Sequence, residues 1–292
     1  MMDSLEALLK EGTKVLEDAG IEEAGLDAWL LLEYTTGRNR AYYFAHKEEA
    51  VEKEAAETFR ELIGKRGKRI PLQHLTHQAF FMGYEFYVNE HVLIPRQDTE
   101  TLAEEALKVL KDRGDPEILD MCTGSGCILL SLLIGKKDAT GTGVDLSREA
   151  LLVAERNAES LGVSDRASFL RSNLFSDEYF CKKDDKKSRE YDILISNPPY
   201  IRTSDIEELM DEVKLHDPRM ALDGFEDGLY FYREITARAQ EFLKPGGWLM
   251  YEIGCDQGED VKELLLKEGF RNTEIRQDLC GRDRVVLGQK SL

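Results

Sequence analysis

Short apolar segments alternate with longer amphipathic ones from Pro116 to the end of the chain, and this alternation constrains the fold more than any other feature of the sequence. We expect strands at 117–121, 139–145, 166–172, 191–196 and 246–254, and helices at 127–135, 147–162, 228–243 and 260–269. Because parallel strands need crossover connections, this order predicts an α/β fold, a doubly wound, mostly parallel sheet with helices on both faces. Two final segments, 272–278 and 282–289, predict an antiparallel hairpin that completes seven strands.

The first seventy residues have a different, helical pattern. Apolar residues recur at helical spacing in the stretches 5–16, 26–33 and 51–63, which glycine and charged residues separate. We therefore expect residues 1–70 to form an N-terminal helical bundle. No reactive side chains converge in it, so it serves either as a scaffold or as a surface that recognises a substrate or partner.

Residues 71–97 change to short aromatic and β-branched runs, which are typical of strands. The runs AFFMGYEFYV and HVLIP are joined by Asn89 and Glu90. We therefore expect a β-hairpin linker that turns at these two residues.

The large domain is expected to occupy residues 98–292 and to begin with a helix. Asp98 and Thr99 stand at the N-cap of this helix, because their side-chain oxygens can accept hydrogen bonds from its first N–H groups. The acidic residues that follow favour the positive end of a helix dipole.

The loop after the first strand of the large domain is the first candidate for cofactor binding. It consists of five small residues: Cys122, Thr123, Gly124, Ser125 and Gly126. Ligands of doubly wound sheets lie beyond the carboxyl ends of the strands, where glycine lets the backbone approach them closely. The loop has neither the G-x-G-x-x-G pattern of dinucleotide binding nor the Lys-Ser/Thr ending of a P-loop. It therefore favours another adenosine-bearing cofactor.

The second candidate is Asp145, at the end of the second strand. A carboxylate in this place can accept hydrogen bonds from both hydroxyls of a ribose, although an acidic residue there also fits NAD. The alternative role is the N-cap of the following helix, which Ser147 can fill instead. We therefore expect Asp145 to bind ribose.

The third candidate, the tetrapeptide Asn197-Pro198-Pro199-Tyr200, follows the apolar strand YDILIS. Consecutive prolines fix φ and supply no N–H donors, so the neighbouring carbonyls are held without partners on that side. The Asn197 side-chain oxygen and the Pro198 carbonyl then form a pair of acceptors that matches a planar NH2 group with two donors. Tyr200 is expected to supply an aromatic wall for a flat substrate. The motif predicts a site for an amide or exocyclic amino nitrogen.

These three features together resemble the class I S-adenosylmethionine-dependent amino-methyltransferases, which have a Rossmann-like sheet, and within them the HemK/PrmC family. The resemblance extends over nearly the whole chain, through the helical bundle, PLQHLT (71–76), VLIPRQDTETLAEE (92–105), ILDMCTGSGCI, SNPPYI, 217–235 and 243–257. N-P-P-Y alone is shared with DNA and RNA adenine methyltransferases. The I-P-R-x-D-T-E segment and the helical domain are typical of the HemK/PrmC family.

The resemblance implies an enzyme that methylates the glutamine side chain in the Gly-Gly-Gln motif of peptide-chain release factors. Its cofactor would be S-adenosylmethionine, with S-adenosylhomocysteine as product and no metal. The implied cofactor contacts are the loop 122–126, Asp145, Asn173, Leu174 and Asn197, and the implied catalytic and substrate-binding residues are Asn197, Pro198, Pro199 and Tyr200.

Three residues depart from the family pattern. The family usually has Gly where Cys122 stands, often Pro where Gln97 stands, and in some members an aromatic residue where Leu174 stands. We expect the approach of the loop backbone to the cofactor to differ slightly, and the contact with the adenine to be less specific.

The charge balance separates the chemistries that share N-P-P-Y. With 57 Asp and Glu against 39 Lys and Arg the formal charge is −18, which disfavours phosphate backbones and anionic lipids. No apolar run approaches the roughly 18 residues of a membrane span, and the N-terminus has no features of a signal or transit peptide. We expect a cytoplasmic monomer that acts on a protein.

Two alternatives remain open. One is N6-adenine or other amino-group methylation of a nucleic acid, for which the basic clusters at 64–69 and 182–187 are small or interrupted. The other is a non-catalytic binding partner of a translation factor, against which the intact Asp145 and Asn197 argue.

Overall fold

The computed structural model describes residues 3–181 and 190–292, which form two compact units. The helical unit comprises the chain up to Gln78 together with Met210–His216, and the sheet unit comprises Ala79–Leu209 and Asp217–Leu292. The mixed charge run expected as a loop at 177–190, with its basic cluster, lies mostly outside the described residues. No helix of the described chain is long and apolar enough to cross a membrane.

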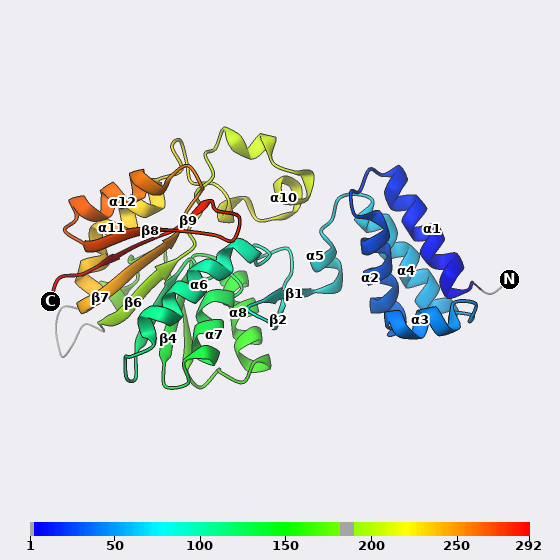
Figure 1. The fold of residues 1–292 in the computed structure, drawn as a ribbon, viewed down its shortest axis with the longest axis horizontal. Helices are drawn as coiled ribbons and strands as arrows, with labels where there is room; N and C mark the ends of the chain where they lie inside the picture. Colours follow the sequence, from blue (N-terminus) through cyan, green and yellow to red (C-terminus); the bar gives the residue numbers. More distant parts are fainter. Residues whose placement is uncertain (1–2, 182–189) are drawn as a thin grey trace. The chain divides into compact units, whose positions relative to one another are not determined.

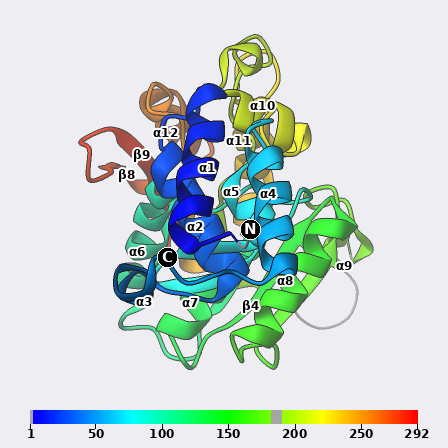
Figure 2. The same cartoon turned by 90° about the vertical axis from the view of Figure 1, so that its right-hand side faces the viewer.

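The helical unit is built from α1 (Leu5–Asp18), α2 (Ala24–Thr36), α3 (Arg40–His46), α4 (Lys53–Arg66), α5 (Leu72–Thr76) and α10 (Asp211–His216). The three expected amphipathic helices are confirmed as α1, α2 and α4, which lie side by side in Figure 2. Their apolar stripes meet in one core around Leu8, Leu31 and Phe59. The short helix α3 is additional; it starts where the Asn39 side chain accepts the N–H of Tyr42.

The hairpin linker has a different register from the one expected. Its strands are β1 (Gln78–Phe81) and β2 (Tyr84–Tyr87), and the chain turns at Met82 and Gly83, both with positive φ. The turn expected at Asn89 and Glu90 is therefore wrong, because a tight two-residue turn needs positive φ at both positions and Met-Gly supplies it here. The segment of the second expected strand packs instead against α8 (Arg148–Ser160).

The sheet unit contains the seven-stranded, mostly parallel sheet that the sequence predicts (Figure 1). Its strands are β3 (Glu117–Met121), β4 (Thr140–Asp145), β5 (Ala167–Arg171), β6 (Tyr191–Ser196), β7 (Leu243–Glu252), β8 (Arg271–Gln277) and β9 (Asp283–Gln289). Their order is β5-β4-β3-β6-β7-β9-β8, with only β9 antiparallel to its neighbours β7 and β8. The expected terminal hairpin is confirmed, and its second strand joins the parallel part of the sheet.

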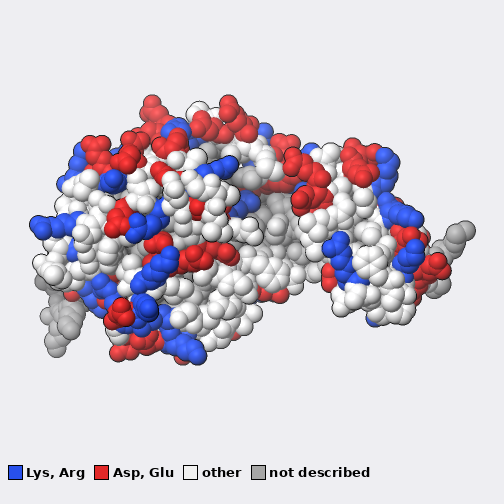
Figure 3. All heavy atoms as spheres, in the orientation of Figure 1, with Lys and Arg blue, Asp and Glu red and all other residues white. Residues whose placement is uncertain are grey.

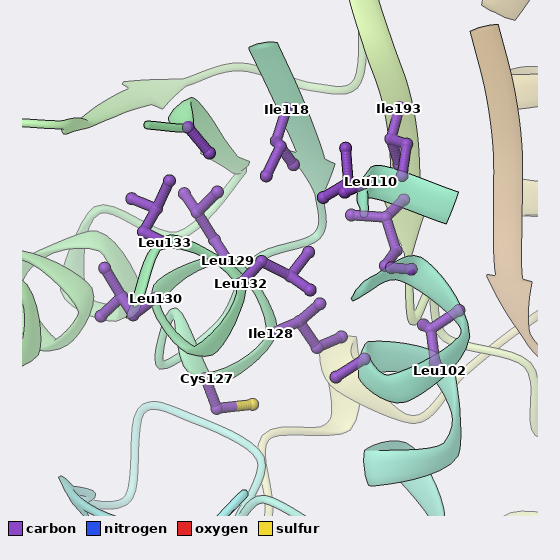
Figure 4. Packing of buried hydrophobic residues seen from close by; sticks show 14 of the residues in the cluster. Leu102, Leu110, Ile118, Cys127, Ile128, Leu129, Leu130, Leu132, Leu133 and Ile193 are labelled. Carbon is purple, nitrogen blue, oxygen red and sulfur yellow. The ribbon is translucent and has the colours of Figure 1, made fainter. Parts of the chain in front are cut away.

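Helices cover both faces of this sheet. They are α6 (Gln97–Leu110), α7 (Cys127–Gly135), α8 (Arg148–Ser160), α9 (Glu178–Cys181), α11 (Tyr230–Phe242) and α12 (Gly258–Lys267), with short 3-10 turns at Asp205–Glu208 and Arg219–Ala221. Neighbouring strand residues alternate between the faces. Ile118 packs with α6 and α7, and Leu119 packs with α11 and α12. Figure 4 shows the first of these cores, with leucines of α7 between Ile118 and Leu102 of α6.

The strand order reverses at β3, which pairs with β4 on one side and β6 on the other. The loops after these three strands are therefore brought to the same edge of the sheet, the place where α/β proteins bind ligands. The Ser196 hydroxyl donates to the carbonyl of Met121 at 2.6 Å and ties the ends of β6 and β3 together. All three motifs identified in the sequence follow these strands.

Candidate active site

A cavity of about 440 Å³ lies at this edge, wholly within the sheet unit. Nine residues expected at the site line it: Cys122, Thr123, Gly124, Ser125, Asp145, Asn173, Leu174, Asn197 and Pro199. Gly126, Pro198 and Tyr200 do not. Gly126 begins α7, and a β-carbon there would come within 3.2 Å of Leu130 and Ala154, so this glycine serves the packing of the helix.

The loop at 122–126 is fixed by hydrogen bonds to the strand ends. The Thr123 hydroxyl donates to Asp120 Oδ2 at 2.5 Å, and the Thr123 N–H donates to the Val144 carbonyl at 3.0 Å. Cys122 has a φ of +63° and Gly124 one of +55°, a region that favours glycine. A β-carbon on Gly124 would meet nothing within 4 Å, so the loop presents bare backbone to open space.

Asp145 holds this loop through its carboxylate. Its Oδ2 accepts the N–H of Gly124 and its Oδ1 accepts the N–H of Ser147, each at 2.9 Å. Burial raises the pKa of Asp145, against the hydrogen bonds from these two N–H groups. The alternative role as N-cap of α8 belongs to Ser147, whose hydroxyl accepts the N–H of Ala150 at 3.1 Å. Each Asp145 oxygen keeps a lone pair for a further donor.

Asn197 is held through its side-chain nitrogen. Nδ2 donates to Thr99 Oγ1 at 3.4 Å, and this is the single hydrogen bond of the side chain within residues 3–181 and 190–292. The Asn197 oxygen therefore stays available as an acceptor. The carbonyl of Pro198 likewise accepts no hydrogen bond from the described part of the chain.

Thr99 is not an N-cap, contrary to the expectation. Helix α6 begins at Gln97 after Arg96, and neither Arg96 nor any other side chain caps it through a hydrogen bond. Asp98 Oδ2 lies 3.2 Å from Nη2 of Arg284, and Thr99 is buried. Both side chains therefore have tertiary partners in place of the first N–H groups of α6.

Tyr200 holds the N-P-P-Y motif in place through hydrogen bonds on the side away from the cavity, and it does not line the cavity. Its hydroxyl donates to Glu252 Oε1 at 3.2 Å, and its carbonyl accepts Nε2 of Gln257 at 3.0 Å. The loop at 223–228 packs directly on this residue: a β-carbon on Gly228 would lie 2.4 Å from the Tyr200 carbonyl oxygen. The expected wall is wrong for Tyr200 because its polar tip is satisfied by the buried Glu252.

Aromatic side chains from the following segment line the cavity instead. Phe225 and Phe231 lie in its wall, and Phe225 is 50% exposed, which places it at the mouth. The Phe225 ring contacts Tyr230 and Phe231, with centroids 4.6 and 5.9 Å apart. Phe225 has a φ of +69°, and its N–H is held by Asp223 Oδ1 at 3.0 Å. Such strained backbone is typical of functional sites.

Two further acidic side chains near the cavity, besides Asp145, have raised pKa values. Burial raises the pKa of Asp120 to about 7, against the hydrogen bond from Thr123. Burial also raises the pKa of Asp217 to about 6, against the attraction of Arg96, whose guanidinium lies 2.8 Å from Oδ2. Both carboxyls hold backbone segments that line the cavity.

The motifs in the sequence do not identify Thr99, Glu252 or Gln257 as members of the site. Thr99 and Glu252 lie far apart in the sequence and meet only because α6 covers the end of β7. All three residues lie in segments that carry the family resemblance, Thr99 in 92–105 and Glu252 and Gln257 in 243–257, and this was the available indication for them.

Comparison with known protein families agrees with these features. Residues 7–76 match the PrmC N-terminal domain, and residues 99–223 match the methyltransferase small domain. A release factor glutamine methyltransferase of Clostridium acetobutylicum is 38% identical over 282 residues, 97% of this chain and 96% of the relative. The chain belongs to the release factor glutamine methyltransferase family.

Further members are similar over most of their length. The release factor glutamine methyltransferase of Geobacter sulfurreducens is 39% identical over 94% of this chain and 92% of its own. Among solved structures, the release factor-specific protein-(glutamine-N5) methyltransferase of Alicyclobacillus acidocaldarius is 27% identical, with a TM-score of 0.43 over 71% of this chain and all of that one. The match to the methyltransferase small domain and the observed strand order confirm the S-adenosylmethionine-dependent methyltransferase fold expected for the large domain.

Two of the three departures from the release factor glutamine methyltransferase pattern, Cys122 and Leu174, lie at positions of positive φ. Cys122 occupies a left-handed backbone conformation, for which the usual glycine is the unstrained residue. Leu174, where some members have an aromatic residue, also has a positive φ of 51° and lines the cavity.

No group of three or more His, Cys, Asp and Glu side chains placed to hold a metal ion is found in the described ranges. Figure 3 shows acidic and basic side chains intermixed over the face in view. The low affinity for nucleic acid expected from the net charge remains a prediction.

Proposed function

We propose that this chain transfers a methyl group from S-adenosylmethionine to the side-chain amide nitrogen of the glutamine in the Gly-Gly-Gln motif of peptide-chain release factors. The observation that carries the proposal is a pair of acceptors that no donor of the described residues occupies: Asn197, which lines the cavity, and the carbonyl of the next residue, Pro198. The chain is also 38% identical over nearly its full length to a release factor glutamine methyltransferase. The pair suits the NH2 group of a primary amide.

The cofactor-binding residues of the proposal are the loop 122–126, Asp145, Asn173, Leu174 and Asn197. Their chemistry fits S-adenosylmethionine, because Gly124 leaves space that any side chain would fill and Asp145 keeps lone pairs for ribose hydroxyls. The apolar lining from Met121, Val144 and Leu174 suits a purine ring. When bound, S-adenosylmethionine supplies an electrophilic methyl group on a sulfonium.

The residues of the chain act chiefly by positioning the acceptor. An amide nitrogen is a weak nucleophile because its lone pair is delocalised into the carbonyl. Asn197 Oδ1 accepts one N–H of the glutamine amide, and the Pro198 carbonyl accepts the other. These two hydrogen bonds fix the direction of the nitrogen lone pair. The same two oxygens stabilise positive charge that develops on the nitrogen. The nitrogen becomes strongly acidic on transfer, so the proton can leave afterwards without a dedicated base.

Two variants test this assignment. Asn197→Ala should abolish methylation and weaken binding of S-adenosylhomocysteine less than Asp145→Ala does, with both affinities measured by calorimetry. Labelled methyl transfer is compared on a release factor, on the same factor with Gln replaced by Ala, and on DNA. Turnover retained by Asn197→Ala contradicts the acceptor pair, and label in DNA favours the nucleic-acid alternative.

The helical unit is the proposed recognition surface for the body of the release factor. Phe44 is 72% exposed on α3, so its ring is accessible to a partner protein. Phe44→Ala should raise KM for the whole factor and leave KM for a short Gly-Gly-Gln peptide unchanged. Leu292→Ala, at an exposed residue of the sheet unit, is the control. Equal effects on both substrates would remove the recognition role.

A further inference from the structure

Three polar side chains form a chain of contacts behind the acceptor site. They are Asn197 after β6, Thr99 in α6 and Glu252 at the end of β7, and the last two are each 2% exposed. Polar groups buried to this extent are normally held in one hydrogen-bonded arrangement.

The strand geometry directs Glu252 towards α6. Met250 packs in the core that contains α6, whereas Tyr251 packs in the opposite core that contains α11. Because side chains alternate along a strand, Glu252 faces the same side as Met250 and reaches Thr99. Burial raises the pKa of Glu252, and three neighbours oppose this shift: the Thr99 hydroxyl first, then the positive charge of Arg284 and the Tyr200 hydroxyl.

The Thr99 hydroxyl has only one proton to donate. Glu252 Oε1 already accepts the Tyr200 hydroxyl, and Oε2 has no partner of good geometry within the described residues. Asn197 Nδ2 donates to the Thr99 oxygen at 3.4 Å, so the Thr99 proton is left for another acceptor. The buried Glu252 Oε2, unpaired among the described residues, can accept it when the carboxyl is ionised.

We infer that Thr99 is a positioning residue, with Glu252 as the acceptor of its proton, and that together they fix the Asn197 amide with its oxygen towards the methyl-accepting nitrogen. This inference rests on the proposed function. The opposite orientation would aim the Asn197 NH2 group at the NH2 group of the substrate, donor against donor. An asparagine alone does not choose between the two orientations, because its oxygen and nitrogen have nearly the same shape.

The orientation can be measured without turnover by NMR of protein labelled with ¹⁵N-asparagine. The side-chain signals of Asn197 are assigned by their loss in Asn197→Ala. In the wild type and in Thr99→Ser, one Nδ2 proton should exchange slowly with solvent because it is bonded to the hydroxyl oxygen. Thr99→Val keeps the shape and removes the hydroxyl, so this protection should be lost and the signals should shift.

Thr236→Val is the matched control. Thr236 is also a buried threonine whose hydroxyl pairs with a side chain of β7, the Tyr251 hydroxyl at 2.9 Å, but it lies on the opposite face of the sheet. This variant should lose a similar amount of thermal stability and leave the Asn197 signals unchanged. If Thr236→Val also removed the protection of Asn197 and shifted its signals, the cause would be a general loss of packing in the sheet unit, and the inference would be overturned.

Kinetics on the Gly-Gly-Gln protein give a second readout. Thr99→Val should lower kcat about tenfold with little change in KM, the scale of one lost hydrogen bond, and Thr99→Ser should stay within about twofold of the wild type. Glu252→Met removes the acceptor and should abolish the Asn197 protection as Thr99→Val does. Asn197 signals that stay unchanged in Thr99→Val refute the inference. A wild type with a protected Asn197 amide but no glutamine methylation refutes the proposed function alone.

Discussion

Replacement of Gly228 by alanine should damage both the stability of the sheet unit and the acceptor site. Gly228 has a φ of +73°, and a β-carbon would lie 2.4 Å from the Tyr200 carbonyl oxygen and 2.6 Å from Gln257 Nε2. The Gln257 side chain could rotate away from the added β-carbon. The Tyr200 carbonyl cannot, because it belongs to the backbone of the last residue of N-P-P-Y. The clash therefore displaces the motif or the loop that carries Gly228.

The magnitude follows from three effects. The left-handed conformation costs an alanine about 1 kcal/mol. Overpacking adds about 1 to 3 kcal/mol, and loss of the hydrogen bond from Gln257 to Tyr200 adds about 1 kcal/mol. Gly228→Ala should therefore lower the free energy of unfolding by about 3 to 5 kcal/mol.

Gly281→Ala separates the backbone effect from the clash. Gly281 lies in the turn between β8 and β9 with a φ of +75°, and a β-carbon there would meet nothing within 4 Å. This variant should lose only about 1 kcal/mol. The free energies are measured by urea unfolding, and kcat by labelled methyl transfer, which should fall in Gly228→Ala alone. Equal losses of stability in the two variants, or a normal kcat in Gly228→Ala, would refute the close packing of Gly228 on Tyr200.

Two more predictions concern titratable groups. The folded pKa of Asp120, about 7, lies above its ordinary value of 3.8, so the folded state holds a proton that the unfolded state releases, and stability should fall as pH rises from about 4 to 7. Asp120→Asn should flatten this part of the thermal-stability profile by up to about 4 kcal/mol, and an unchanged slope would contradict the assignment. Burial raises the pKa of the Cys122 and Cys127 thiols, the latter to about 12, whereas Cys255 and Cys280 are exposed. At pH 8 iodoacetamide should label only the exposed pair of these four in the folded protein, as read by peptide mass spectrometry, and labelling of Cys122 would contradict its raised pKa.

The periodicity of the sequence was enough to predict the sheet. Most strands of the large domain are short runs of apolar or small residues, and most helices between them have an apolar stripe, so local pattern and tertiary burial agree there. The strand at 117–121 and the helix at 127–135 have the bounds that the sequence predicts. The three site motifs were also predictable, because the carboxyl ends of parallel strands share an edge.

Local pattern failed where a distant partner or the backbone conformation decided. The hairpin turns at Met82 and Gly83 because they adopt positive φ, whereas Asn89 and Glu90 carry a more usual turn composition. Thr99 has the composition of an N-cap, but its hydroxyl is engaged behind the acceptor site. Neither choice is visible in the spacing of apolar residues.

The sequence by itself thus determined the class of fold, the edge of the sheet that carries the site and the residues that can accept an amide NH2 group. Only the tertiary structure decided how these groups are aimed. It turned the Tyr200 hydroxyl to Glu252, brought Phe225 to the mouth of the cavity and left the oxygen of Asn197 without a donor among residues 3–181 and 190–292. The physical reason is that the direction of a hydrogen bond depends on partners remote in sequence, whereas apolar periodicity depends only on residues close together in the sequence.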